Sequence, residues 1–199
     1  MQDKLKLKTE NMEETKNPNG VDMPSVGGYV EAVKENSNNA KVSFVAESTW
    51  KGGTKAEVNV KEFFADGKPA SRPDRHFKFN VTEPSQLGGA DDAPNPVELL
   101  AAAVCGCLTA GIATNSAMFG TELEKLDVKV KVDFDLMGVL GLDRNISNGA
   151  QHLHYTVTLK GKAAKEALQK TKETLDRKSA ILTTLKNPLN ITTEFIIEE

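Results

Sequence analysis

The sequence predicts an α+β domain in which an antiparallel sheet packs on one long central helix. Three patterns indicate this class: short segments with alternating apolar and polar residues, an uncharged apolar segment in the middle of the chain, and an amphipathic segment near its end. The expected order of elements is β-β-β-α-β-β-α-β, which is typical of an α+β domain with one central helix.

The length and composition of the chain suit one domain with an appendage. Its 199 residues are 39% hydrophobic and 27% charged, so the chain can bury a core. Residues 1–40 are polar and contain the turn signals NPNG and SNN, with a short possible helix at 29–34. We therefore predict an N-terminal appendage or mobile tail over 1–40 and a folded domain over 41–199.

Charge and targeting signals narrow the class of protein. The formal charge is −3 and no Lys/Arg block with interleaved aromatic residues is present, so we expect no nucleic-acid partner. The N-terminal stretch MQDKLKLKTENMEETK contains no apolar segment of the secretory type, which predicts a cytoplasmic protein. Cys105 and Cys107 could not bridge within an intact helix, and the absence of a disulfide framework fits a reducing compartment.

Period-two alternation predicts the strands. Segments 42–50, 55–60 and 76–81 are expected to form an antiparallel meander. In segments 126–136 and 151–160, apolar residues fall on one face and polar residues on the other, so one face should meet a core and the other water.

The central helix has clear end signals. Asn95 fits the N-cap, Pro96 the first helical position and Glu98 the third position of a capping box, and Gly120 fits the residue after the C-cap. We therefore predict one helix over 96–119.

This helix is apolar nearly all round, as expected of a helix buried on every side. Its continuous apolar part is shorter than the ~18 residues of a membrane span, so we expect no membrane association. The small residues Ala102, Gly106, Ala110 and Ala113 form a stripe that another helix could approach closely. The elements expected after the strands are an amphipathic helix over 163–178, a helical turn near 180–185 and a last strand over 190–197.

The two cysteines are the first candidates for chemistry. A free cysteine in an apolar helix is usually an inert packing residue, and a reactive one needs a helix N-terminus, a cation or a metal to stabilise its thiolate. Cys107 lies about three turns into the helix, so its cation would have to come from elsewhere in the chain. The available candidates are Arg72, Arg75, Lys55 and Arg144.

Glu98 and the histidine pair His152 and His154 each allow a functional and a structural interpretation. Glu98 could orient such an arginine, but helix capping explains it equally well. His152 and His154 share a strand face, where a solvated face is favoured over a metal site because further ligands with suitable spacing are missing. Nucleotide-binding loops and the Gly-x-Ser-x-Gly motif are absent as well, so we predict neither a metal nor another cofactor.

The segment NPVELLAAAVCGCLTAGI resembles the central helix of the OsmC/Ohr family of osmotically inducible and organic-hydroperoxide-resistance proteins. STWKGG, RHFKFNVTEPSQLGGADDAPNP, DFDLMGVLGLDRNISNGAQ and RKSAILTTLKNPLNIT resemble further segments of these proteins, in the same order. The resemblance covers roughly 42–197. Counted from Pro96, the position of the reactive family cysteine is Cys107, and Cys105 is a bystander.

The resemblance implies an OsmC-like fold and an intertwined homodimer with its sites at the subunit interface. It also implies thiol-dependent reduction of organic hydroperoxides, in which a cysteine becomes a sulfenic acid and is resolved by a second cysteine.

The sequence departs from that scheme at three positions. Ser179 stands where the resolving cysteine is expected. Thr54 stands where the peroxidases have an arginine after a Gly-Gly turn, so the activating cation would be Lys55 or, in our preferred assignment, Arg75. Val97 matches the peroxidase glutamate, and Glu98 lies one residue further along the helix.

Two functions follow from the resemblance and its departures. The first is a hydroperoxide reductase in oxidative-stress defence, with Cys107, Arg75 and Glu98 as catalytic residues, a small hydroperoxide as substrate and an external thiol as reductant. The second is a non-catalytic OsmC-like protein that binds a hydrophobic small molecule at the dimer interface.

Overall fold

The computed structural model describes residues 18–198 of the chain. The chain divides into two compact units, Met1–Ala102 and Ala103–Glu199, and each is described by itself. Residues 1–17 of the predicted appendage lie outside the described residues.

The described part of the first unit begins with helical structure. A 3-10 turn η1 (Pro18–Gly20) leads to helix α2 (Met23–Glu35) and a second 3-10 turn η2 (Ser37–Ala40). The Asp22 side chain caps α2 by accepting from the Ser25 backbone N–H at 3.0 Å. The short helix predicted at 29–34 is therefore part of a longer one.

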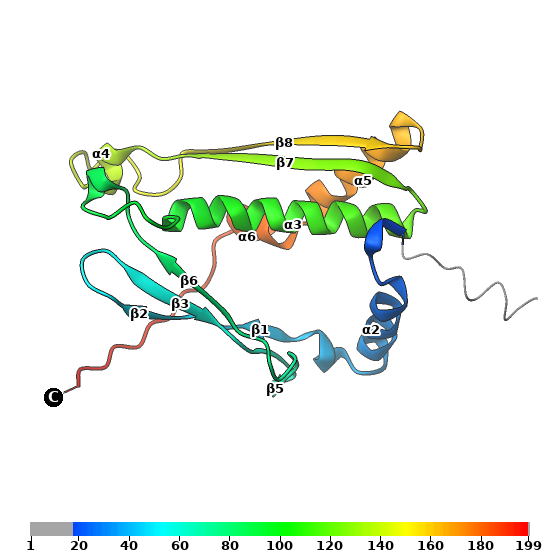
Figure 1. The fold of residues 1–199 in the computed structure, drawn as a ribbon, viewed down its shortest axis with the longest axis horizontal. Coiled ribbons are helices and arrows are strands. Elements are labelled where there is room, and N and C mark those ends of the chain that lie inside the picture. The colour runs from blue at the N-terminus through cyan, green and yellow to red at the C-terminus, as the bar shows by residue number, and fades with distance from the viewer. Residues whose placement is uncertain (1–17, 199) are drawn as a thin grey trace, which may run out of the picture. The chain divides into compact units, whose positions relative to one another are not determined.

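Two small antiparallel sheets follow in the first unit (Figure 1), and a 3-10 turn η3 (Ser85–Leu87) lies between them and the central helix. One has the order β1-β4-β5 and the other β2-β3-β6. Their bounds are β1 (Val42–Phe44), β2 (Glu47–Trp50), β3 (Ala56–Val60), β4 (Phe63–Ala65), β5 (Lys68–Pro69) and β6 (Phe77–Val81).

The predicted single strand over 42–50 is wrong, because its two halves belong to different sheets. β1 pairs with β4, whereas β2 pairs with β3, so the chain breaks between Phe44 and Glu47 to change partners. The other two strands of the predicted meander correspond to β3 and β6, which pair antiparallel.

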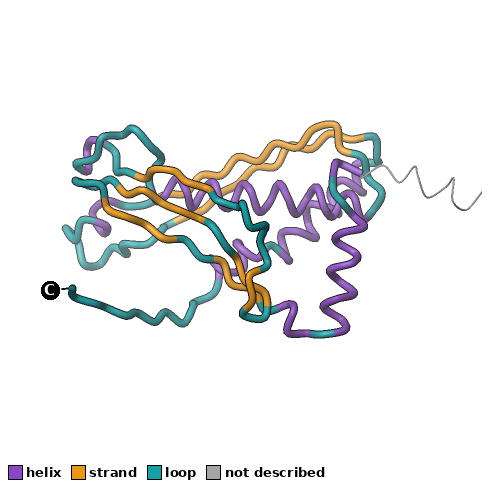
Figure 2. The backbone as a smooth tube through the Cα atoms, turned by 60° about the horizontal axis from the view of Figure 1, so that its bottom comes forward, coloured by secondary structure: helices purple, strands orange, loops and turns teal. Residues whose placement is uncertain are grey.

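The second unit is built on α3 (Pro96–Met118), within which the boundary between the units falls. β7 (Leu123–Asp133) and β8 (His152–Gly161) form an antiparallel pair that runs along this helix, and α4 (Leu136–Val139) lies in their connection (Figure 2). The predicted alternation is confirmed, since half-buried and exposed residues alternate along β8. β7 starts and ends three residues earlier than the predicted 126–136.

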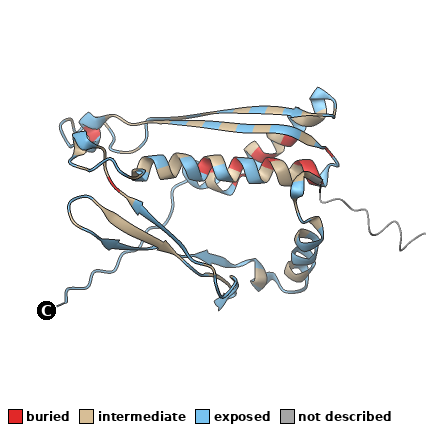
Figure 3. Ribbon diagram, viewed as in Figure 1, coloured by how far each residue is buried: buried red, intermediate tan, exposed pale blue. Residues whose placement is uncertain are grey.

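Helices α5 (Lys165–Lys178) and α6 (Ala180–Lys186) follow β8 and close the core of the second unit. The buried hydrophobic cluster consists of Val104, Leu108, Ile112, Leu175 and Leu182, and apolar residues of β7 and β8 pack against it. Figure 3 shows that buried residues gather on α3, α5 and α6.

The expectation that α3 is buried on every side is wrong for the single chain. Ala102, Gly106 and Ala110 of the predicted small-residue stripe are exposed, and a Cβ added at Gly106 would meet nothing within 4 Å. The close helix approach occurs at Gly111 instead, where a Cβ would lie 2.4 Å from Leu175 Cδ1 on α5. The second unit therefore packs on one side of α3.

By length and composition alone, α3 is apolar enough to cross a membrane, and 17% of its most apolar window is buried. The prediction that this apolar segment is too short for a membrane span is therefore wrong. Core helices of water-soluble domains also meet this criterion of length and composition. Its packing against β7, β8 and α5 marks α3 as the core helix of the second unit.

The predicted last strand over 190–197 is absent from the structure, where these residues have no regular secondary structure. A strand needs a neighbour that accepts and donates its backbone hydrogen bonds. None of the strands in the described part of the chain pairs with this segment. Its apolar side chains Ile191, Phe195, Ile196 and Ile197 are accordingly exposed.

Candidate active site

The N-terminus of α3 is fixed by a reciprocal capping box. The Asn95 side chain accepts from the Glu98 backbone N–H at 2.9 Å, and the Glu98 carboxylate accepts from the Asn95 N–H at 2.8 Å. This confirms that Glu98 caps α3, whereas its role in orienting an arginine stays a prediction. Glu98 lies nine residues before Cys107, about 13 Å along the helix axis, so the two side chains are not in direct contact.

Cys107 is held at the edge of the buried core. Its neighbours along α3, Val104 and Leu108, are fully buried, whereas Cys107 itself is half-buried. Its sulfur lies 3.3 Å from the hydroxyl oxygen of Ser179, a distance within hydrogen-bonding range for sulfur. The thiol is thus partly accessible and has a polar neighbour.

Ser179 links α5 to α6. It is the C-cap residue of α5 and the N-cap residue of α6, where its hydroxyl accepts from the Leu182 backbone N–H at 3.3 Å. The side chain is buried, with 1% of its surface exposed. The residue predicted to stand at the resolving position is therefore in contact with the candidate nucleophile.

Cys105 points to a different part of the second unit. Its thiol donates to the Val128 carbonyl oxygen on β7 at 3.7 Å. This contact with the backbone of a neighbouring strand suits a packing residue.

The candidate cations all lie in the first unit or on the surface loops, and three have partners there. The Arg75 guanidinium donates to the Lys61 carbonyl oxygen and lies 4.9 Å from the centre of the Phe77 ring. Lys55 donates to Asp92 at 2.6 Å, which holds the pKa of that carboxyl below its usual value. Arg72 lies 3.6 Å from Asp74. Activation of Cys107 by Arg75 stays a prediction.

The turn at Thr54 borders a cavity of about 330 Å³ in the first unit. The Thr54 hydroxyl lies 3.4 Å from that of Thr82, which is buried, and accepts from the Glu83 backbone N–H. Where the peroxidases are expected to carry an arginine, this chain has a hydroxyl pair. Neither threonine carries a charge, and the cation that this turn supplies is the neighbouring Lys55, which also lines the cavity.

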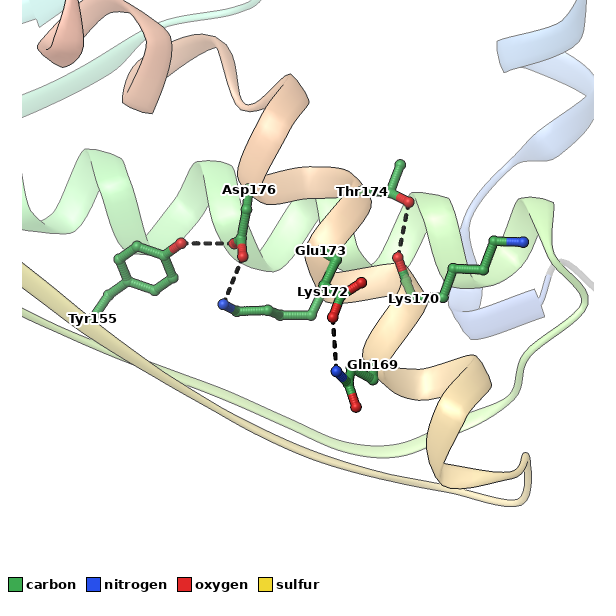
Figure 4. Close-up of polar contacts among 7 residues, drawn as sticks. All are labelled: Tyr155, Gln169, Lys170, Lys172, Glu173, Thr174 and Asp176. Carbon is green, nitrogen blue, oxygen red and sulfur yellow. Dashed lines mark hydrogen bonds and ion pairs between the residues drawn. The ribbon is translucent and has the colours of Figure 1, made fainter.

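One polar cluster in the second unit, shown in Figure 4, is not predicted by the sequence. The Tyr155 hydroxyl donates to Asp176 at 2.6 Å, and Lys172 donates to the other oxygen of the same carboxylate at 2.6 Å. Burial and this hydrogen bond raise the pKa of Tyr155 to about 12. The cluster joins β8 to α5 three residues before Ser179. Tyr155 was predicted only as an inward residue of its strand, and no spacing rule connects it with Asp176.

The two histidines on β8 lie on its exposed face, as predicted. The His152 and His154 rings are stacked with their centres 6.3 Å apart. Among residues 18–198, no group of three or more His, Cys, Asp or Glu side chains is placed to hold a metal ion.

The second unit thus combines an antiparallel β-hairpin, a long core helix and a half-buried thiol beside a buried hydroxyl. Together these features place the protein in the class of α+β domains that carry a thiol in the core helix. A family profile described as OsmC-like protein matches residues 89–194, and the chain belongs to this OsmC-like family. No curated protein matches the chain.

Solved structures share the fold at low sequence identity. An OsmC-like protein from Mycoplasma pneumoniae is 10% identical with a TM-score of 0.53, over 73% of this chain and 87% of that one. A protein from Psychrobacter arcticus 273-4, named for osmotic stress induction and a detoxification response, is 12% identical with a TM-score of 0.52, over 70% and 85% of the two chains. These similarities establish the fold.

Proposed function

We propose that the protein is a cytoplasmic thiol-dependent reductase of organic hydroperoxides that uses Cys107 alone. The observation that carries this proposal is the half-buried Cys107 sulfur 3.3 Å from the buried Ser179 hydroxyl. Membership of the OsmC-like family supports the same reaction class. A role in oxidative-stress defence follows from such an activity.

The reaction begins when the Cys107 thiolate attacks the outer oxygen of the hydroperoxide. An S–O bond forms while the O–O bond breaks, and the departing alkoxide takes a proton and leaves as an alcohol. Cys107 is then a sulfenic acid. Its neighbour is a hydroxyl and not a thiol, so the chain itself cannot resolve this acid to a disulfide at Ser179.

Reduction therefore needs two equivalents of an external thiol. The first attacks the sulfenic sulfur, which forms a mixed disulfide and releases water. The second attacks the mixed disulfide, so that an oxidised external disulfide leaves and the Cys107 thiol is restored. Arg75 is proposed as the cation that favours the thiolate, and Glu98 as the carboxylate that orients it.

The protein is further proposed to be a homodimer. The exposed stripe of Ala102, Gly106 and Ala110 offers a surface on which a second helix can lie closely. Large apolar residues are also exposed, among them Phe44, Trp50 and Phe195. Aromatic side chains are enriched at protein interfaces.

The activity is tested with cumene hydroperoxide and an excess of dithiothreitol or dihydrolipoamide. Wild-type protein should consume the hydroperoxide, Cys107→Ser should abolish consumption, and Cys105→Ser should retain it. Cys105→Ser is the matched control because it removes a thiol from the same helix. Equal rates for wild type and Cys107→Ser would refute the reductase proposal.

The supporting residues are tested in the same assay. Arg75→Gln and Glu98→Gln should each slow consumption without abolishing it, since neither side chain forms the bond to oxygen. Labelling of the sulfenic acid with dimedone, followed by intact mass measurement, should add one adduct at Cys107 after a single equivalent of peroxide.

A second candidate function is non-catalytic binding of a hydrophobic small molecule at the dimer interface. The absence of a resolving thiol favours this binding function, because Ser179 stands at the resolving position and the Cys105 thiol is hydrogen-bonded to the Val128 carbonyl. In that case Cys107 lines the ligand site. Binding of a fluorescent apolar probe that is unchanged in Cys107→Ser, together with no peroxide consumption, would support this function over the first.

A further inference from the structure

The Ser179 hydroxyl contacts two groups, the backbone N–H of Leu182 and the sulfur of Cys107. The Leu182 backbone N–H donates to its oxygen at 3.3 Å and so occupies one lone pair. The Cys107 sulfur lies 3.3 Å from the same oxygen. Because the N–H can only donate, the hydroxyl proton is free to point at the sulfur.

We propose that Ser179 is a positioning residue for Cys107, and that its hydroxyl donates a hydrogen bond to the thiolate sulfur and favours the ionised form. A hydrogen bond donated to a charged group stabilises that charge more than it stabilises the neutral form. Burial strengthens this stabilisation of the thiolate. Because only 1% of the Ser179 surface is exposed, little water competes for the hydroxyl proton. The catalytic consequence of this inference rests on the proposed function, whereas the hydrogen bond itself does not.

The backbone around Ser179 is held in place on both sides. Its N–H donates to the Leu175 carbonyl at 2.7 Å, and its carbonyl accepts from the Thr183 N–H at 2.9 Å. Leu175 and Leu182 belong to the buried cluster that also contains Val104 and Leu108 of α3. A donor fixed in this way loses little entropy when the thiolate forms.

The other titratable groups near this contact have partners of their own or face solvent. Cys105 on the same helix donates to Val128 of β7, and Asp176 of α5 accepts from Tyr155 and Lys172. The basic residues that end α5, Arg177 and Lys178, are exposed.

The test measures how fast Cys107 is alkylated by iodoacetamide as a function of pH, in a Cys105→Ser background in which a single thiol reacts. Ser179→Ala should move the midpoint of this profile upward by about one pH unit, which leaves about tenfold less thiolate at neutral pH. Ser179→Thr keeps a hydroxyl and should restore the wild-type midpoint.

Ser116→Ala is the matched control. Ser116 is a fully buried serine of α3 whose hydroxyl has no hydrogen-bond partner among the described residues, so its removal should leave the midpoint unchanged. Thermal melts of all variants monitor the loss of the α6 N-cap, which lowers stability without changing the ionisation of Cys107.

An unchanged midpoint in folded Ser179→Ala would overturn the inference, as would an equal shift in Ser116→Ala. The alkylation assay needs no peroxide, so the two proposals can fail separately. Peroxide consumption with an unchanged midpoint would refute only the role of Ser179. A shifted midpoint without peroxide consumption would refute only the reductase.

Discussion

Cys105 and Cys107 lie on one helix but have different surroundings. Residues two apart on a helix point about 200° away from each other, so the two thiols face different neighbours. One donates to a strand carbonyl and the other contacts a serine hydroxyl. The same local sequence therefore provides one packing thiol and one candidate nucleophile.

Single residues of the site were predictable to different degrees. Cys107 and Ser179 were both identified through the family resemblance, but they are 72 residues apart, and only the folded chain brings their side chains together. Glu98 was predictable as a cap because its partner Asn95 is three residues away. Tyr155 and Asp176 were missed because a strand and a helix supply one residue each.

At the residue scale, the Tyr155 phenol should lose its proton at an unusually high pH. The chain has two tyrosines, so Tyr29→Phe leaves Tyr155 as the single phenol for a tyrosinate absorbance titration. The midpoint should lie near pH 12, because burial and the hydrogen bond to Asp176 disfavour the charged form. A midpoint near the ordinary value of about 10 would contradict the buried contact.

The same shift links Tyr155 to stability. An unfolded chain releases this proton near pH 10, whereas the folded chain retains it up to about pH 12. The contribution of Tyr155 to the free energy of unfolding is therefore complete below about pH 10 and is lost as the pH rises toward 12. Tyr155→Phe should lack this part of the alkaline decline.

At the scale of elements, local signals predicted helix ends better than strand pairing. Asn95 and Gly120 mark the two ends of α3 within the sequence itself, and Gly120 has the expected positive φ of 65°. The division of 42–50 into two strands depends on β4, which lies about twenty residues further along the chain. The segment 190–197 has residues typical of a strand, but no strand in the described part of the chain pairs with it through backbone hydrogen bonds.

The close approach of α3 and α5 makes a prediction at this scale. Gly111→Ala should destabilise the protein by about 1 kcal/mol, since overpacking against Leu175 at about 2 kcal/mol outweighs the gain in helix propensity of about 1 kcal/mol. Urea denaturation measures the effect. In a Leu175→Val background the trimmed side chain should remove most of the penalty, and the same penalty in both backgrounds would contradict the contact.

At the scale of the whole molecule, the exposed stripe on α3 predicts self-association. Sedimentation velocity should give twice the mass of one chain, and Gly106→Leu should shift the population toward the monomer because its side chain would hold a second helix away. Thr156→Leu adds a similar side chain on the exposed face of β8 and should leave the dimer intact. A monomeric wild type would contradict the dimer proposal.

The boundary between the two units falls inside α3, and this limits how the chain can be divided. A cut after Ala102 would leave about two turns of helix on one fragment and the remaining turns on the other. Helical stubs of that length do not persist alone in water, and each would carry unsatisfied backbone groups at the cut. The start of α3 thus depends on the rest of the helix, and expression of residues 1–102 alone should yield a fragment in which these two turns are unfolded.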